Sequence, residues 1–166
     1  MIEKEPKWEL PGSEIEKIVQ QLMQERSMPP HYSRMLAMRG IRSTGEIEAF
    51  VNPSLDDLRD PFLMSDMEKA VKRLKRALKS GERVIVLGDY DVDGVCGTAL
   101  FMRVLTNFGV KVGYHVPDRF KEGYGVSKEG VDHAVEFGAT LIVSVDSGIT
   151  AIVETEYARS LGIDVI

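Results

Sequence analysis

The sequence has a single cysteine, Cys96, among 166 residues, so no disulfide can form within the chain. So little cysteine is typical of a reducing, intracellular compartment, and the cytoplasm is the expected location. No apolar run approaches the roughly 20 residues that span a bilayer, and the first residues lack the apolar stretch of a secretory signal. The net charge of −5 argues against a basic protein that coats nucleic acid. These absences favour an intracellular protein without membrane contact, and they leave open a nucleic-acid enzyme whose acids are covered by metal ions.

The sequence pattern changes near residue 64. Residues 1–64 contain short helical stretches separated by loops and prolines, and we expect a helical amino-terminal segment there. From residue 65 onward, apolar runs of strand length alternate with helical stretches. The first of these helices is expected to begin with a capping box formed by Ser65 and Glu68.

The four expected strands are continuous apolar runs rather than alternating ones. They cover residues 83–88, 111–117, 140–146 and 163–166, and the helices between them start near residues 94, 127 and 150. Continuous apolar strands suit a parallel sheet that is covered on both faces. The sequence therefore predicts an α/β fold with a parallel, doubly wound sheet of order βαβαβαβ and right-handed crossovers.

Four aspartates lie at or shortly after the carboxyl ends of two of these expected strands. Asp89, Asp91 and Asp93 alternate in "GDYDVDG", and Asp146 ends "LIVSVD". Residues two apart share a side of an extended chain, so the first three are expected to converge, and ligands bind at this edge of such sheets. Two carboxylates about 4 Å apart repel by roughly 4 kcal/mol at an effective dielectric constant near 20. A hard divalent cation would relieve that repulsion, so the pattern predicts a metal site.

Three other interpretations of this turn are open. "DYDVDG" matches the start of an EF-hand calcium loop, but Leu100 stands where that loop needs a glutamate, and an expected strand rather than a helix precedes it. A dinucleotide-binding turn would need glycines where the acids stand. The third interpretation is a solvated turn without a metal.

Two stretches, "VLGDYDVDGVCGTAL" and "LIVSVDSGIT", resemble the first and second motifs of the DHH phosphoesterase superfamily. The loop "HVPDRFKEGYGVS" and the lead-in "PPHYSRMLAMRGI" are similar to those of its RecJ branch, over roughly residues 6–166. The resemblance implies a 5′→3′ exonuclease that hydrolyses the phosphodiester bonds of single-stranded DNA in repair and recombination, using two Mn²⁺ (or Mg²⁺) ions. It assigns Asp91, Asp93 and Asp146 as metal ligands, and Asp89 as a ligand or as a base beside them.

The sequence departs from the family pattern at two points. Many members have a histidine where Leu87 stands, and Asp89 is expected to take over part of its role. The Asp-His-His motif is absent, so residues 65–166 are expected to be the first part of a DHH domain, in an amino-terminal fragment that is inactive alone. Histidine ligands from the remaining part would favour Mn²⁺ over Mg²⁺.

The glycine-containing loop after residue 117 carries the candidate substrate contacts. Arg119 and Lys121 can meet phosphate, and Tyr124 can stack on a base. By their spacing alone these would be ordinary surface residues. The RecJ resemblance instead indicates a substrate-binding loop, with Arg119 and Tyr124 as contacts and Gly123 and Gly125 beside them.

Two further residues, His115 and Cys96, could have functional roles but are interpreted as structural. His115 is interpreted as a packed or solvated histidine rather than a metal ligand, and Cys96 is expected to be buried, without a base that would make it a nucleophile. Two other functions remain open for the whole chain. One is a DHH phosphoesterase for short oligonucleotides or cyclic dinucleotides, and the other is a non-catalytic RecJ-like scaffold.

Overall fold

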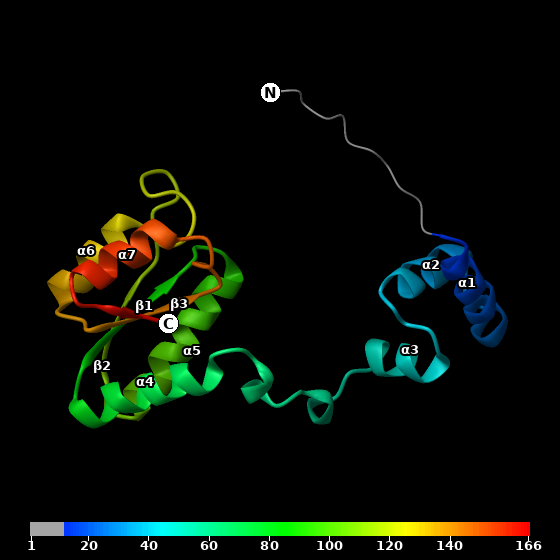
Figure 1. Cartoon of the computed structure of the whole chain (residues 1–166), viewed down its shortest axis with the longest axis horizontal. Coiled ribbons are helices and arrows are strands. Elements are labelled where there is room, and N and C mark those ends of the chain that lie inside the picture. The colour runs from blue at the N-terminus through cyan, green and yellow to red at the C-terminus, as the bar shows by residue number, and fades with distance from the viewer. Residues whose placement is uncertain (1–11) are drawn as a thin grey trace. The chain divides into compact units, whose positions relative to one another are not determined.

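The computed structural model describes residues 12–166, so the first eleven residues of the expected helical segment lie outside the described residues. The chain forms two compact units, one ending at Asp60 and the other formed by Pro61–Ile166 (Figure 1). Each unit has its own hydrophobic core. Within the described residues, no helix combines the length and apolar content needed to cross a membrane.

The first unit packs three short helices and a 3-10 turn, which are α1 (Ser13–Arg26), α2 (Pro30–Met38), α3 (Thr44–Val51) and η1 (Leu55–Asp57). Its core is a small cluster of Leu22, Ile41 and Ile47. A capping box starts α3, because the Ser43 hydroxyl accepts from the Glu46 amide while the Glu46 carboxylate accepts from the Ser43 amide. This unit therefore relies on local caps as well as on a modest core.

The second unit is built on a four-stranded sheet of order β2-β1-β3-β4 in which every neighbouring pair is parallel. The strands are β1 (Arg83–Gly88), β2 (Lys111–His115), β3 (Leu141–Val145) and β4 (Asp164–Val165). The helices are η2 (Pro61–Leu63), α4 (Met67–Ser80), α5 (Val92–Asn107), α6 (Lys128–Phe137) and α7 (Ile152–Ser160). The predicted α/β fold with a parallel sheet is confirmed.

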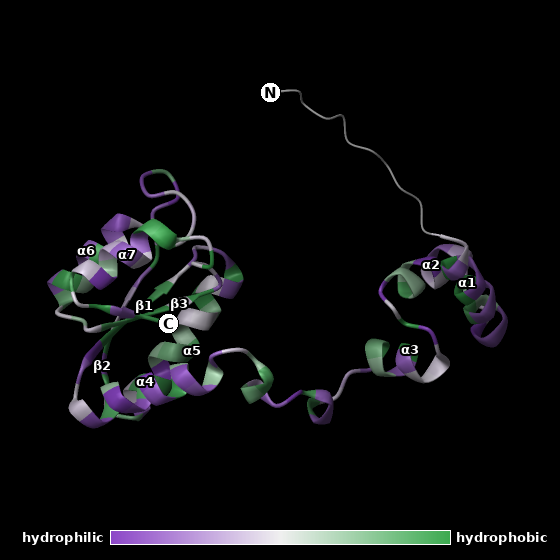
Figure 2. Ribbon diagram, viewed as in Figure 1, coloured by the Kyte–Doolittle hydropathy of each residue, from purple (hydrophilic) through white to green (hydrophobic). Residues whose placement is uncertain are grey.

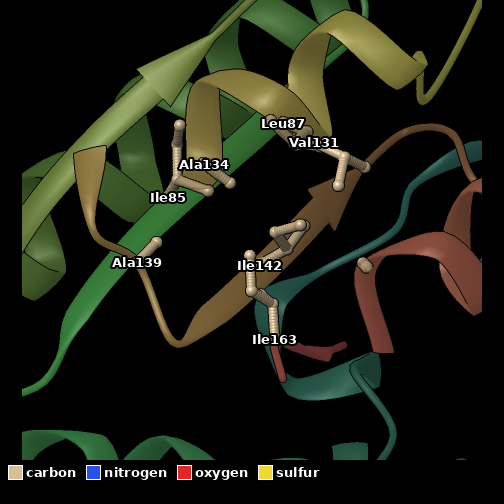
Figure 3. Packing of buried hydrophobic residues seen from close by; sticks show 8 residues of the cluster. Ile85, Leu87, Val131, Ala134, Ala139, Ile142 and Ile163 are labelled. Carbon is tan, nitrogen blue, oxygen red and sulfur yellow. The ribbon is translucent and has the colours of Figure 1, made fainter. Parts of the chain in front are cut away.

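Two apolar clusters cover the two faces of this sheet. Ile85 and Leu87 of β1 face α6 and α7, where they pack with Val131 and other residues (Figure 3). Val84 and Val86 face the other way, toward α4 and α5. All four side chains are almost fully buried. The central strands are therefore apolar over most of their length (Figure 2), with Arg83 at the start of β1 and Ser144 in β3 as the polar residues, which is why they appear as nearly continuous runs in the sequence.

Three local predictions are wrong. Helix α5 begins at Val92 rather than near Gly94, because Asp91 caps it earlier. The Ser65 capping box is absent, because the residue before α4 is Asp66, which has a left-handed backbone and no side-chain cap bond. Cys96 is exposed, because the face of α5 that packs on the sheet is formed by residues such as Thr98.

Candidate functional site

The register of the sheet brings the predicted acids to one edge. Gly88 is the last residue of β1 and pairs with Val145, the last residue of β3. Asp89 and Asp146 are the next residues of their segments, so both leave the sheet at the same level. The loop after β2 starts at this edge too, because Leu87 pairs with His115.

Asp89 lies beneath the start of α5 with only 1% of its surface exposed. Neither of its carboxylate oxygens has a hydrogen-bond partner among the described residues. Close backbone packing creates this position, since a Cβ atom on Gly94 would lie 2.4 Å from the Asp89 carbonyl oxygen. A buried carboxylate without a donor is costly, and a bound cation is one way to satisfy it.

Asp91 has a structural task as the N-cap of α5. Its Oδ1 accepts hydrogen bonds from the backbone amides of Asp93, at 3.1 Å, and Gly94, at 2.9 Å. The chain is therefore no longer extended after Asp91, and Asp93 lies in the first helical turn with an exposed side chain. The expectation that the three acids converge by strand alternation is wrong, because the helix cap turns the chain.

Asp146 follows β3 with a backbone φ of 59°, in the left-handed region that aspartate tolerates better than most residues. Burial, followed by the nearby carboxylates of Asp91, Asp93 and Asp89, raises the pKa of Asp146. The other three carboxylates thus act electrostatically on Asp146. Even so, within residues 12–166 no three acids, cysteines or histidines form a group that could hold a metal ion.

The donor set fits a divalent cation in part. All four side chains offer carboxylate oxygens, which hard divalent ions prefer, and a bound ion would give the two Asp89 oxygens the partner that they lack among the described residues. The described residues supply only part of such a site, because no three of them gather closely enough.

The predicted substrate loop rests against this acidic edge. The Tyr124 hydroxyl donates to the main-chain oxygen of Asp146 at 3.3 Å, and its ring meets Tyr90 edge-on, with 6.3 Å between the centroids. The Arg119 guanidinium lies over the ring of Tyr90, 5.2 Å from its centroid. Burial, together with Asp89 and Asp146, raises the pKa of Tyr124. The structure therefore places Arg119 and Tyr124 beside the acids.

Gly123 and Gly125 have a backbone role in this loop. Their φ angles are 85° and 88°, a region that side chains disfavour. These angles turn the chain on both sides of Tyr124. Phe120, the neighbour of Arg119 in this loop, is 96% exposed and was not among the residues predicted from the sequence.

Glu122 is the residue that sequence reasoning missed most clearly. Its Oε1 accepts from the Asp118 amide at 2.9 Å, and its Oε2 lies 2.6 Å from the Ser127 hydroxyl and 2.8 Å from His115 Nε2. Burial alone would raise the pKa of Glu122, but these three partners hold it below its ordinary value. His115 also meets His133 edge-on, so it is packed as interpreted. An acid inside a glycine-containing loop was the only signal in the sequence.

Comparisons with known proteins point to one family. Residues 83–166 match the family model described as "DHH family, N-terminal domain". The chain is 34% identical over 166 residues to the single-stranded-DNA-specific exonuclease RecJ of Bacillus subtilis, covering 100% of this chain and 21% of that protein. It is 45% identical over 140 residues to the RecJ of Escherichia coli, covering 84% and 24%. The chain thus spans between a fifth and a quarter of these relatives.

Two solved structures are similar as well. One, described as exonuclease RecJ bound to manganese, has a TM-score of 0.57 and 38% identity over 61% of this chain and 26% of that one. Another is RecJ in complex with Mn²⁺ from Thermus thermophilus, with a TM-score of 0.59 and 27% identity over 95% of this chain and 21% of that one. The family model covers about half of the chain, including both acidic turns, and the chain belongs to the DHH family.

Proposed function

We propose that this chain is the amino-terminal part of a divalent-metal-dependent exonuclease that hydrolyses single-stranded DNA from its 5′ end. The observation that carries the proposal is the buried Asp89 carboxylate without a partner among the described residues, at the edge where Asp91, Asp146 and the Arg119–Tyr124 loop also lie. The names of its relatives support the choice of single-stranded DNA as substrate.

The acids would hold the metal ions. Asp89, Asp91 and Asp146 are the first candidates, and Asp93 is nearby in the first turn of α5. Bound divalent ions supply an activated water and stabilise the leaving oxygen of a phosphodiester. Two relatives of known structure contain manganese, which supports Mn²⁺ as the ion.

The adjoining loop would hold the DNA. The Arg119 guanidinium is suited to a phosphate, and the Tyr124 ring to a base. Both side chains contact Tyr90, which stands between Asp89 and Asp91 in the chain. A DNA strand bound along the loop would therefore pass the metal site. In this way one loop fixes the scissile bond relative to the ions.

We infer that further metal ligands come from segments outside this chain. Residues 12–166 contain no group of three ligands in metal-binding geometry, and the chain covers 21–24% of the two relatives described above. The chain alone should therefore show no turnover, whereas the full-length protein should be active.

The test is degradation of 5′-labelled single-stranded DNA by the full-length protein with MnCl₂, compared with the same strand in a duplex. Asp146→Asn should lower the rate by more than ~100-fold, since even the residues that support metal ligands contribute 10- to 100-fold. Glu136→Gln, which removes the same charge from an exposed position of α6, should have no effect. Equal rates for Asp146→Asn and wild type would refute the proposal, and preference for dinucleotides over long strands would point to a different DHH activity.

A further inference from the structure

Glu122 is a largely buried acid whose position the proposed chemistry does not explain. Its side chain is 11% exposed and lies beneath the loop that joins β2 to α6. It accepts from three separate points, which are the start of the loop at Asp118, the N-cap of α6 at Ser127, and the end of β2 at His115. One carboxylate thus ties both ends of the loop to the sheet.

The turn above Glu122 is fixed by a second acid. The Asp118 carboxylate accepts from the amides of Phe120, at 2.9 Å, and Lys121, at 3.3 Å. The Asp118 carbonyl oxygen accepts from the Glu122 amide at 2.8 Å. Arg119 lies inside this turn, so its direction follows from the hydrogen bonds on either side of it. Glu122 is the link between this local turn and the rest of the fold.

The far side of the loop is held through aromatic rings. Tyr90 contacts both Arg119 and Tyr124, and the Tyr124 hydroxyl reaches the Asp146 carbonyl oxygen. These contacts are weak individually, because cation–π and edge-on ring contacts at exposed positions contribute little stability each. They can orient Arg119 and Tyr124 only if the base of the loop is already in place.

We propose that Glu122 is a positioning residue, which holds the loop so that Arg119 and Tyr124 meet the DNA at the acidic edge. The inference rests on the proposed function and adds a residue that does not touch the substrate. Glu122 acts through Arg119 and Tyr124 rather than on the DNA itself, because its carboxylate is already engaged by His115 and Ser127 beneath the loop. A residue that only stabilised the fold would instead affect every property of the protein together.

The experiment measures kcat/KM on single-stranded DNA for the full-length protein and its Glu122→Ala variant. The variant should lose ~10- to 100-fold, as expected when a displaced loop misplaces a bound substrate. The MnCl₂ concentration for half-maximal rate should not change, because the acids remain in place. Glu122→Gln should recover most of the loss, since its oxygen still accepts from the Asp118 amide. Glu129→Ala, at an exposed position of α6, serves as the matched control.

A mutant cycle with Arg119 and Tyr124 identifies the route of the effect. If Glu122 acts through these two contacts, adding Glu122→Ala to a protein that already carries Arg119→Ala and Tyr124→Ala should change kcat/KM by no more than about threefold, because coupled residues are not additive. The inference is overturned if the loss in kcat/KM of the combined variant is the product of the separate losses. It is also overturned if Glu122→Ala keeps the wild-type kcat/KM, or if it needs a different MnCl₂ concentration for half-maximal rate. Where Glu122→Ala melts below the assay temperature, Glu122→Asp, which keeps the charge on a shorter side chain, takes its place. A wild-type protein that cleaves no single-stranded DNA refutes the proposed function as well, whereas unchanged activity of Glu122→Ala refutes only this inference.

Discussion

Replacing Gly94 by alanine tests whether backbone packing holds the acidic turn in place. A Cβ atom at this position would lie 2.4 Å from the Asp89 carbonyl oxygen and 2.5 Å from the Asp89 amide nitrogen. Non-bonded contacts need roughly 3.5 Å. The start of α5 would therefore have to withdraw from the end of β1 by about 1 Å, and neither side of the contact is a flexible side chain.

The expected loss of stability follows from two opposing effects. Overpacking costs about 1–3 kcal/mol, and a contact between two backbone segments belongs at the upper end of that range. Alanine is favoured over glycine inside a helix by about 1 kcal/mol. The net loss for Gly94→Ala is thus about 2 kcal/mol, which lowers the urea midpoint by ~1 M when the urea dependence is about 2 kcal/mol per molar.

Urea unfolding followed by circular dichroism measures this loss. Gly45→Ala is the matched control, because Gly45 lies in the first turn of α3 and its added Cβ atom would have no atom within 4 Å. That variant should gain up to about 1 kcal/mol. A Gly94→Ala variant with a midpoint at or above that of the wild type would show that the acidic turn is not held by this contact.

Two further predictions concern the two units separately. The hydrogen bond from Thr140, and then the Arg73 guanidinium against the opposing effect of burial, lower the pKa of Glu82. This carboxylate therefore stabilises the fold above its unfolded pKa of about 4.3, and its contribution is lost as the pH falls through the lower folded pKa. Below pH ~5, the free energy of unfolding from urea titrations should thus fall less steeply for Glu82→Gln than for the wild type. Parallel curves for the two proteins would contradict this. In the first unit, Ser43→Ala removes the hydroxyl that accepts from Glu46 and should cost about 1 kcal/mol in thermal unfolding, and an unchanged melting temperature would exclude a role for this cap.

The strands could be predicted from the sequence because a run of consecutive apolar residues is a local pattern. Val84, Ile85, Val86 and Leu87 are all buried, since alternate residues enter two different apolar clusters. Such a run has no other stable place in an α/β domain. The position of Asp89 follows from the same pattern, because the end of a buried parallel strand is where ligands bind.

The details of the site depend on contacts that local patterns do not encode. Asp91 was predicted to lie in an extended chain, but its side chain caps α5 and the extended backbone ends there. The role of Glu122 needs Asp118, Ser127 and His115 to meet, and His115 comes from a strand seven residues away along the chain. Only the fold brings those three donors around one carboxylate.

The burial of Asp89 predicts that its carboxylate lowers the stability of the fold in the absence of a metal ion. A buried charge without a partner costs several kcal/mol, whereas a buried amide without a partner costs about 1–3 kcal/mol. Asp89 is 1% exposed with both oxygens unpartnered among the described residues. Asp89→Asn should therefore raise the free energy of unfolding of residues 1–166 by about 1–2 kcal/mol in EDTA, although the substitution removes a candidate ligand.

Urea unfolding in EDTA, and again in MnCl₂, separates the two effects. Any stabilisation by Mn²⁺ follows from binding to the folded state, so it should be smaller in Asp89→Asn than in the wild type. Asp56→Asn, at an exposed position of η1, should change neither measurement. If Asp89→Asn instead destabilises the chain in EDTA, the carboxylate has a partner that satisfies it without a metal, and the main argument for an ion at this edge fails. If the variant is more stable in EDTA and less responsive to Mn²⁺, the acid is kept at a cost to the fold that only binding a cation explains.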